Sequence, residues 1–481
     1  MRRQIVPRAA GAGFALLLGG MLAGCAARHY HPAPIAADRA AAAFEARRLT
    51  DPGLRAFAEH TLGEAWPPPS WDYRALSLAA LYFNPSLDAA RARIAESQAH
   101  LLTAGARPNP SLELTPGIPS PYLLTFDLSF PLETAGKRGY RVQAARSLDL
   151  AARLDLAQAA WTVRSAVRAA LIDHLEASAT LQHLRAEAAL RTEQVRLLEA
   201  TASAGEISRQ DVSTAEVELS RAHTAVADAA ARSVESKAAL AAAIGIPVAA
   251  LDDVRLDWPD WESPPSAASL PREAIERDAV LNHLEVRAAL AQYAAAESAL
   301  QLEIAKQYPD IDIGPGYTYE EKRSYFTVGF AATIPLFARN PGPIAEAEAR
   351  RRQVEAQFVQ TQSAVISRSE RALALYDAAL EGLAEADRFT EVQKRRAGAT
   401  RKSVAAGEEG RLELDTAEIE SSVAARARLE ELARAQRALG DLEDAVERPL
   451  SPGDALPAAA GLDGDSNQTG PSVTSDTPPA R

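Results

Sequence analysis

The chain contains the same short motif twice, about two hundred residues apart. Residues 203–216 read SAGEISRQDVSTAE and residues 405–418 read AAGEEGRLELDTAE, so AGE and TAE both recur at an offset of 202 residues. The surroundings repeat too, since each copy predicts a long helix, two short strands, a very long helix, a turn and another long helix. Solenoid repeats are about 20–50 residues long, so a unit of this size indicates a duplicated fold.

Composition favours helices and excludes one class of partner. The 481 residues are rich in Ala, Leu, Glu and Arg, and only 6% are aromatic, which is typical of long helices and coiled coils. The formal net charge of −12 argues against a nucleic-acid partner, because phosphate backbones bind basic surfaces. A solvated acidic surface explains most of that charge.

The N-terminus has the pattern of a lipoprotein signal. Three arginines within the first eight residues precede an apolar stretch, residues 9–22, which ends in Leu-Ala-Gly-Cys25. The stretch is too short for a membrane helix and its end resembles a bacterial lipobox. We therefore expect a signal peptide at 1–24 and a lipid on Cys25, the chain's single cysteine; an ordinary secretory peptide is the alternative. Ala26 favours sorting to the outer membrane.

The rest of the chain divides into five segments. Prolines predict an extended segment at 25–72, a linker at 246–271 and, with Gly, Ser and Asp, a disordered tail at 449–481. Repeat 1 covers 73–245 and repeat 2 covers 272–448. We expect helices at 73–106 (interrupted at Pro85), 136–204, 205–245, 272–307, 344–406 and 407–448, and strands at 111–117, 122–131, 310–320 and 324–335.

The strands suggest a membrane role. Apolar and polar residues alternate along them, and strands of about ten residues cross a bilayer when tilted. No apolar run after Leu22 reaches the roughly 18 residues of a membrane helix. Four strands cannot close a barrel, whereas three chains would supply twelve. A soluble four-stranded sheet packed on the helices is the alternative.

Taken together, residues 73–448 resemble the TolC/OprM family of outer-membrane efflux proteins. Residues 130–138 (FPLETAGKR) and 334–342 (IPLFARNPG) are similar to its CzcC-like heavy-metal branch, although Ala135 and Ala338 stand where that branch usually has Gly and Asn. The resemblance implies a mainly α fold with a transmembrane β part. It also implies a homotrimer that forms a 12-stranded β-barrel and a long periplasmic α-helical barrel.

The resemblance also implies a function and partners. We expect a passive duct that exports divalent heavy-metal cations, with a periplasmic adaptor, an inner-membrane pump of the resistance-nodulation-division type and outer-membrane lipid. Drug efflux or type I secretion by the same architecture, and a soluble periplasmic coiled-coil adaptor, are the alternatives. The residues form no catalytic constellation and the eight histidines are scattered, so we expect no enzyme, no metal site and no cofactor.

The two helical turns hold the candidate site residues. Gly205 suits a left-handed helix end, and Ser208 with Asp211 matches a capping box; Gly410 with Glu413 matches it less well. Caps alone would explain these residues, but the resemblance places the turns where family members meet the adaptor. The predicted contact residues are Gly205, Glu206, Ile207, Ser208, Gly407, Glu408, Glu409 and Gly410.

Three acidic residues near these turns are candidates for a periplasmic aperture. They are Asp211, Glu413 and Asp415, and the resemblance favours the second repeat, where Glu413 lies at the matching distance from the turn glycine. Thr416 replaces the second acid of the TolC pattern. Three carboxylates around a threefold axis would select cations. The alternative is that these acids only cap helices.

Overall fold

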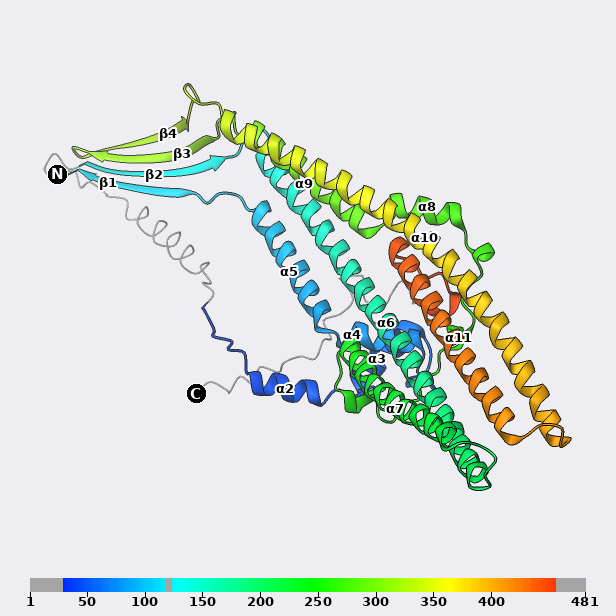
Figure 1. Cartoon of the computed structure of the whole chain (residues 1–481). Helices are drawn as coiled ribbons and strands as arrows, with labels where there is room; N and C mark the ends of the chain where they lie inside the picture. Colours follow the sequence, from blue (N-terminus) through cyan, green and yellow to red (C-terminus); the bar gives the residue numbers. More distant parts are fainter. Residues whose placement is uncertain (1–28, 118–122, 456–481) are drawn as a thin grey trace, which may run out of the picture. The chain divides into compact units, whose positions relative to one another are not determined.

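The computed structural model describes residues 29–117 and 123–455, in two units (Figure 1). The first unit ends at Ala46, and its described residues, 29–46, contain one helix, α2 (Ala37–Glu45). The second unit begins at Arg47 and contains every other described helix and strand. The signal peptide, Cys25 and residues 456–481 of the predicted tail lie outside the described residues.

The prediction of an extended segment at 25–72 is wrong for two stretches. Residues 37–45 form α2, and residues 52–62 form α3 (Pro52–Leu62). The Asp51 carboxylate accepts hydrogen bonds from Gly53 N and Leu54 N, and Pro52 occupies the first helical position. Proline suits that position because its missing N–H would have no partner there. The prolines of this segment were taken as evidence for an extended chain, but Pro52 begins a helix.

The second unit shows one order of elements twice: two helices, two strands, a very long helix and a returning helix. The first half consists of α4 (Tyr73–Phe83), α5 (Pro85–Gly105), β1 (Ser111–Gly117), β2 (Leu123–Leu132), α6 (Lys137–Ser203) and α7 (Arg209–Ile244). The second half consists of α8 (Arg272–Leu281), α9 (Leu284–Ala305), β3 (Ile311–Glu320), β4 (Arg323–Ala332), α10 (Pro341–Ala405) and α11 (Arg411–Val446).

Two helix boundaries of the second half differ from the prediction. The helix expected at 272–307 is broken before Leu284, where His283 caps α9 by accepting a hydrogen bond from Glu285 N. The prediction missed this break because it has no proline, unlike the break before Pro85. Helix α10 begins at Pro341 rather than 344, again with proline in the first turn.

The four strands form one antiparallel sheet in the order β1-β2-β3-β4 (Figure 1). Its register places Leu114, Phe126, Tyr317 and Phe326 in one row across all four strands. The neighbouring rows on that face are also mainly apolar, and Phe326 is 84% exposed. Because side chains alternate between faces, the opposite face carries the charged and hydroxyl residues. One face of the sheet is thus mainly apolar, and no other element of the described residues covers it.

Two backbone features hold this register. At Gly314 a Cβ atom would lie 1.7 Å from Leu128 O, so only glycine allows β2 and β3 to approach this closely. The β3–β4 turn has Glu321 and Lys322 at φ 45° and 69°, the conformation of a two-residue hairpin turn. The turn predicted at 321–323 is therefore one residue shorter, since Arg323 pairs with Glu320.

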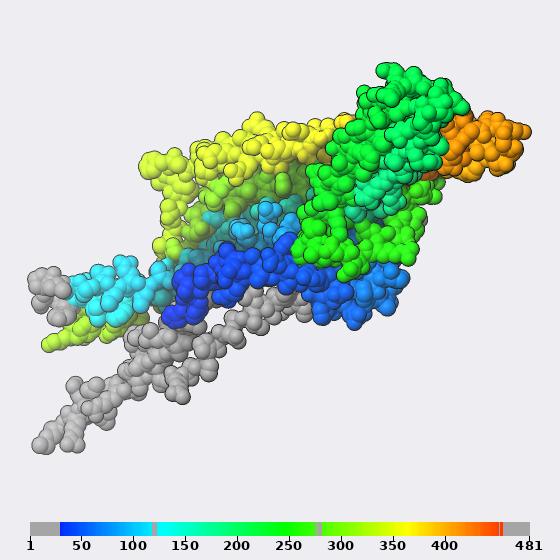
Figure 2. Space-filling model, turned by 60° about the horizontal axis from the view of Figure 1, so that its bottom comes forward, coloured from blue at the N-terminus to red at the C-terminus, as the bar shows by residue number. Residues whose placement is uncertain are grey.

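The helices pack mainly along α6, which contacts α5, α7, α9 and α11, while α10 packs against α9 and α11. Figure 1 shows the strands at one end of these helices and the turns of the α6–α7 and α10–α11 hairpins at the other. In Figure 2 the green end of the α6–α7 hairpin and the orange end of the α10–α11 hairpin form two separate projections. Within the described ranges, no helix is both long enough and apolar enough to cross a membrane.

A buried charged cluster joins the two halves. Arg168 of α6 is 3% exposed, and its guanidinium lies 2.8 Å from Glu443 Oε2 of α11 and 3.2 Å from Asp454 Oδ2. Arg164 Nε donates to the hydroxyl of the buried Tyr73. The Arg168 guanidinium also lies over the Trp258 ring, 5.1 Å from its centroid. Paired in this way, buried charges avoid the desolvation cost of an isolated ion.

This cluster includes residues from two segments that the sequence predicted to be irregular, the linker at 246–271 and the tail at 449–481. Trp258, inside the predicted linker, is 6% exposed and donates a hydrogen bond to Asp454. Asp454 itself lies in the segment predicted to be disordered, yet it is 3% exposed and burial raises its pKa to about 6. Proline content marked both segments as irregular but could not show that they are packed. The linker and residues 450–454 are therefore part of the folded unit.

Candidate functional site: the hairpin turns and the acidic residues behind them

The two hairpin turns end their long helices in the same way. Gly205 and Gly407 have φ of 85° and 77°, and each is followed by a backbone N–H that bonds to a carbonyl five residues earlier. These bonds join Glu206 N to Thr201 O at 3.2 Å and Glu408 N to Ser403 O at 2.9 Å. The left-handed glycine and this bond define a Schellman cap. A short, fixed turn results in both places.

The starts of the returning helices differ. In the first turn, Asp211 N donates to Ser208 Oγ, and the Asp211 carboxylate accepts from Ser208 N at 3.1 Å. That reciprocal pair is the predicted capping box. In the second turn, Gly410 occupies the cap position and supplies no side-chain hydrogen bond. The start of α11 therefore lacks the reciprocal side-chain cap that α7 has.

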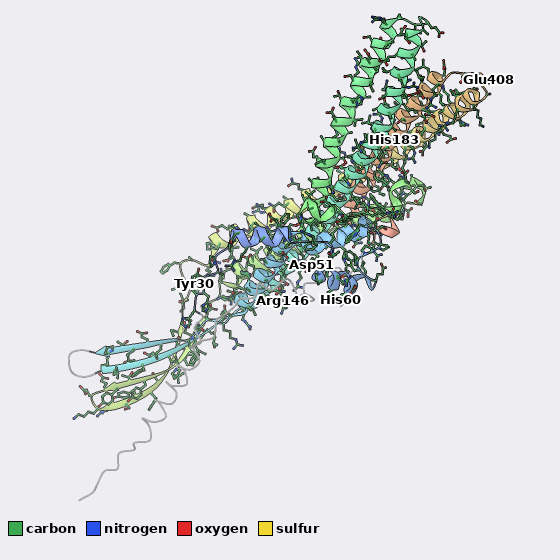
Figure 3. The ribbon with its side chains drawn as sticks, turned by 90° about the horizontal axis from the view of Figure 1, so that it is seen from below. Tyr30, Asp51, His60, Arg146, His183 and Glu408 are labelled. Atoms are coloured by element: carbon green, nitrogen blue, oxygen red, sulfur yellow. The ribbon has the colours of Figure 1, made fainter. Side chains whose placement is uncertain are left out.

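The predicted tip residues lie on the surface. All eight are exposed except Ile207, which is half-buried. Figure 3 labels Glu408 at the end of the α10–α11 hairpin and His183 farther back, and the α6–α7 hairpin ends separately. Glu206, Glu408 and Glu409 make both turns acidic at their ends. Their exposure makes the turns available to a partner.

The three aperture candidates have different environments. Asp211 is exposed and engaged in the capping box, and Glu413 is exposed near the start of α11. Asp415 is 0% exposed, 2.9 Å from Arg411 Nε, and burial raises its pKa despite the nearby Arg411 charge. A carboxylate enclosed in this way cannot line a passage in this conformation. Glu413 is therefore the one second-repeat candidate at the surface.

Behind the turns, polar contacts hold α11 against α6, and the sequence did not indicate them. Gln194 Nε2 donates to Thr416 Oγ1 at 3.1 Å. Farther along, Glu187 accepts from Arg191 at 2.9 Å on its own helix and from Arg426 of α11 at 3.1 Å. Thr416, noted as a departure from the family pattern, thus has a contact of its own. The spacing of four residues between Glu187 and Arg191 is typical of an ion pair within one helix. It gave no indication of the contact with Arg426.

A buried pair of titratable groups lies at the other end of α11. His283 Nδ1 is 3.4 Å from Glu447 Oε2, and the two side chains are 0% and 3% exposed. Burial raises the pKa of Glu447 to about 7 and lowers the pKa of His283. Within the ranges that the structure covers, no group of three or more His, Cys, Asp or Glu side chains could hold a metal ion.

These features define a class of protein: long helical hairpins attached to a small antiparallel sheet with one uncovered apolar face. Known proteins share this fold. VceC of Vibrio cholerae has a TM-score of 0.63 at 20% identity over 79% of this chain and 97% of its own. The open-state outer-membrane channel MtrE of Neisseria gonorrhoeae has a TM-score of 0.63 at 18% identity over 79% of this chain and 89% of its own.

Two sequence comparisons add to this similarity. Residues 76–246, from α4 to the end of α7, match the outer membrane efflux protein family. The cobalt-zinc-cadmium resistance protein CzcC of Cupriavidus metallidurans is 26% identical over 272 residues, 56% of this chain. That match spans 63% of the length of CzcC. The predicted resemblance to outer-membrane efflux proteins is thus confirmed, and so is its mainly helical fold with a small antiparallel sheet.

Proposed function

We propose that this protein is the outer-membrane duct of a tripartite efflux system and that three copies form it. The observation that supports this most strongly is the sheet, whose register places apolar side chains of all four strands on one exposed face. Lipid is the environment in which such a face is stable. Its two outer strands, β1 and β4, would then need partners, because unpaired backbone groups in lipid cost several kcal/mol each.

The proposed cargo is divalent heavy-metal cations. The match to CzcC supports this, as does the resemblance of residues 130–138 and 334–342 to the heavy-metal branch. A passive duct needs no metal site of its own, because an inner-membrane pump would supply the energy. The periplasmic adaptor would contact the exposed turns at Gly205–Ser208 and Gly407–Gly410, and a lipid on Cys25 would hold the N-terminus at the membrane.

Growth of a deletion strain tests the cargo. We expect sensitivity to zinc, cobalt or cadmium that the intact gene reverses, with drug sensitivity unchanged. Sensitivity to drugs alone would favour a drug-efflux duct of the same architecture, and a defect in protein export would favour type I secretion. Extraction tests the architecture, because a membrane duct needs detergent and should migrate as a heat-sensitive trimer. A monomer released without detergent would favour the soluble adaptor instead.

The proposed aperture residue is Glu413. Its exposed carboxylate at the start of α11 would form a ring of three in a trimer and attract cations into the passage. We expect Glu413→Gln to reduce the cation selectivity of reconstituted trimers. Asp211→Asn on the other turn is the matched control and should leave selectivity unchanged. Equal selectivity in wild type and Glu413→Gln would leave Glu413 with a helix-end role only.

A further inference from the structure

The strand-to-helix junction of the first half is closed by contacts to the second half of the same chain. Thr134 N donates to Asp310 Oδ1 at 2.9 Å, and Thr134 Oγ1 donates to Pro309 O at 2.6 Å. Lys137 Nζ donates to Asp310 Oδ1 and to Tyr308 O, each at 2.7 Å. Lys137 is only 7% exposed. The end of β2 is therefore connected to the start of β3 by an ion pair between a buried lysine and a partly exposed aspartate.

The second half has an equivalent junction, at which Asn340 donates to Glu303 O of α9 at 2.9 Å but Ala338 and Pro341 stand at the positions of Thr134 and Lys137. Both connections from a strand to a very long helix contain Pro-Leu, at residues 131–132, the end of β2, and at residues 335–336, after the end of β4. Both end at a residue with left-handed φ, 73° at Gly136 and 59° at Asn340, directly before the long helix. The two loops are thus equivalent in position. Yet residues 336–339 of the second loop are all exposed.

The chemistry at the aligned positions also differs. Ala338 and Pro341 replace Thr134 and Lys137, so the second loop lacks both side-chain donors of the first junction. It presents apolar side chains instead, and Phe337 is 101% exposed. Exposed side chains of this size, clustered within four residues, mark an interaction surface. The cluster comprises Ile334, Leu336 and Phe337, with exposed fractions of 69%, 74% and 101%.

A matching surface lies at the opposite edge of the sheet. The turn between α5 and β1, residues 106–110, is exposed throughout, and its Pro108-Asn109 aligns with Pro309-Asp310 of the closed junction. Leu102 and Leu112, on either side of the turn, are 79% and 66% exposed. Strands β1 and β4 are the two edges of the described sheet. Two different surfaces at opposite edges can join copies head to tail, and such contacts form rings when the rotation closes.

We propose that the apolar loop at 333–340 of one copy packs on the α5–β1 turn of a second copy of this chain, with Phe337 as its anchor. The proposal rests on the oligomeric duct proposed above and adds the contact that joins its copies below the strands. Pairing of β4 with the next copy's β1 would bring these two surfaces together, just as the β2–β3 pairing brings Thr134 to Asp310. The junction within the chain is ionic, and the junction between copies is apolar.

Cysteine pairs test this geometry directly in membranes that contain the full chain. Asn109→Cys with Ala338→Cys places one thiol on each surface of the proposed junction between copies. Thr134→Cys with Asp310→Cys is the matched control, because these aligned positions lie together within one chain. After oxidation and heating in detergent, we expect covalent dimers and trimers from the first pair. The control pair should yield only chains of monomer mass, and the unsubstituted protein reports any background from Cys25.

The outcomes separate this inference from the proposed function. Trimers that persist in mild detergent but give no covalent multimers would overturn the packing and leave the duct intact. Loop residues that instead react with a lipid-phase probe would assign the loop to the membrane surface and also overturn it. A chain that is monomeric in mild detergent would overturn the duct itself.

Substitution of the anchor gives a second measurement. Phe337→Asp should shift the dissociation of trimers to lower temperature, because it places a charge in an apolar contact, while Phe337→Leu should restore most of the lost heat resistance. Arg339→Asp, two residues away in the same loop, changes charge without removing an apolar side chain and serves as control. Unchanged dissociation in Phe337→Asp would contradict the anchor role.

Discussion

The two halves of the second unit share an order of elements but not a pattern of contacts. In the first half, α4 lies deep in the main core, with Leu76 and Leu78 0% exposed. In the second half, residues 336–339 of the loop that follows β4 are all exposed, although Asn340 at its end donates to Glu303 O of α9 at 2.9 Å. Equal order with unequal burial indicates that the second half leaves more surface for other molecules.

Each half also has a joint, defined here as the break between its first two helices, α4–α5 or α8–α9. The two joints differ in their contacts. In the first half, Asn84 caps α5 and its Nδ2 donates to Ala243 O near the end of α7 at 3.0 Å, an uncharged contact. In the second half, His283 caps α9 and faces Glu447 at the end of α11. Position and role correspond, but only the second joint can titrate. The first joint is uncharged, whereas the second contains two titratable side chains.

The largest expected effect comes from breaking the cluster that joins the halves. Arg168→Met removes the cation between Glu443 and Asp454 and leaves both carboxylates buried without it. Losing one partner of a buried ion pair costs about 3–5 kcal/mol. Denaturant unfolding of the detergent-solubilised chain measures this. Arg437→Met is the control, because its half-exposed contacts to Asp173 and Glu176 also link α11 to α6 but should contribute only about 0–1 kcal/mol.

The next effect tests the closed junction. Lys137→Met removes the donor to Asp310 and to Tyr308 O, and hydrogen bonds that involve charged groups contribute about 1.5–3 kcal/mol. Hydrogen exchange at the β2 and β3 amides next to the junction should become faster. Pro341→Ala at the aligned position removes no side-chain hydrogen bond, so exchange there should change little. If hydrogen exchange became equally faster in Lys137→Met and Pro341→Ala, the ion pair of the first junction would not distinguish it from the second.

The pH dependence of stability distinguishes the two joints. The pKa of Glu447 in the folded protein, about 7, lies above its ordinary value of 4.5 because burial disfavours the carboxylate. Its contribution to stability is therefore fully present below pH 4.5 and is lost as the pH rises through 7. The groups that face it are His283, Glu285 and Arg368.

Glu447→Gln should accordingly be more stable relative to wild type at pH 8 than at pH 5, as measured by thermal unfolding. Because His283 is present in both proteins, its own titration largely cancels in this difference. Asn84→Ala at the first joint should lower stability by about 1 kcal/mol, with the same loss at both pH values. A pH-independent difference for Glu447→Gln would contradict the titrating joint.

The smallest effect concerns the two turns. Ser208→Ala removes the capping box of α7 and should cost about 1 kcal/mol locally. Gly410→Ser has the opposite expected sign, because Gly410 has extended backbone angles (φ −91°, ψ 169°) and a serine there could form the same box with Glu413. Hydrogen exchange at the first amides of α7 and α11 measures both. Slower hydrogen exchange at the first amides of α7 in Ser208→Ala would contradict the role of Ser208 as a stabilising cap.

Much of the fold was predictable because it depends on local patterns. Helices α6 and α10 follow from long proline-free stretches, and the glycines at 205 and 407 mark their ends. Alternation predicted the strands to within two or three residues at each end. The break at His283 was missed because a histidine cap has no strong local signal. Helix α3 was missed because Pro52 was taken as a breaker rather than as a first helical residue.

In the candidate site too, local features were predictable from the sequence and burial was not. The capping box of Ser208 and Asp211 was visible as a spacing of three residues and is confirmed. The resemblance favoured Glu413 by its distance from the turn glycine, but no local pattern showed that Glu413 is exposed and Asp415 buried. Burial depends on which helices meet, and no local pattern encodes that.

By itself, the sequence determined the repeated order of elements, the two capped turns and the apolar face of the strands, because each depends on residues close together in the chain. Only the tertiary structure decided that Arg168, Glu443 and Asp454 meet, that Lys137 fastens the first junction, and that Phe337 stays uncovered. Those contacts join residues up to 286 positions apart. Their partners are set by the packing of whole helices, which the pattern along any one helix leaves open.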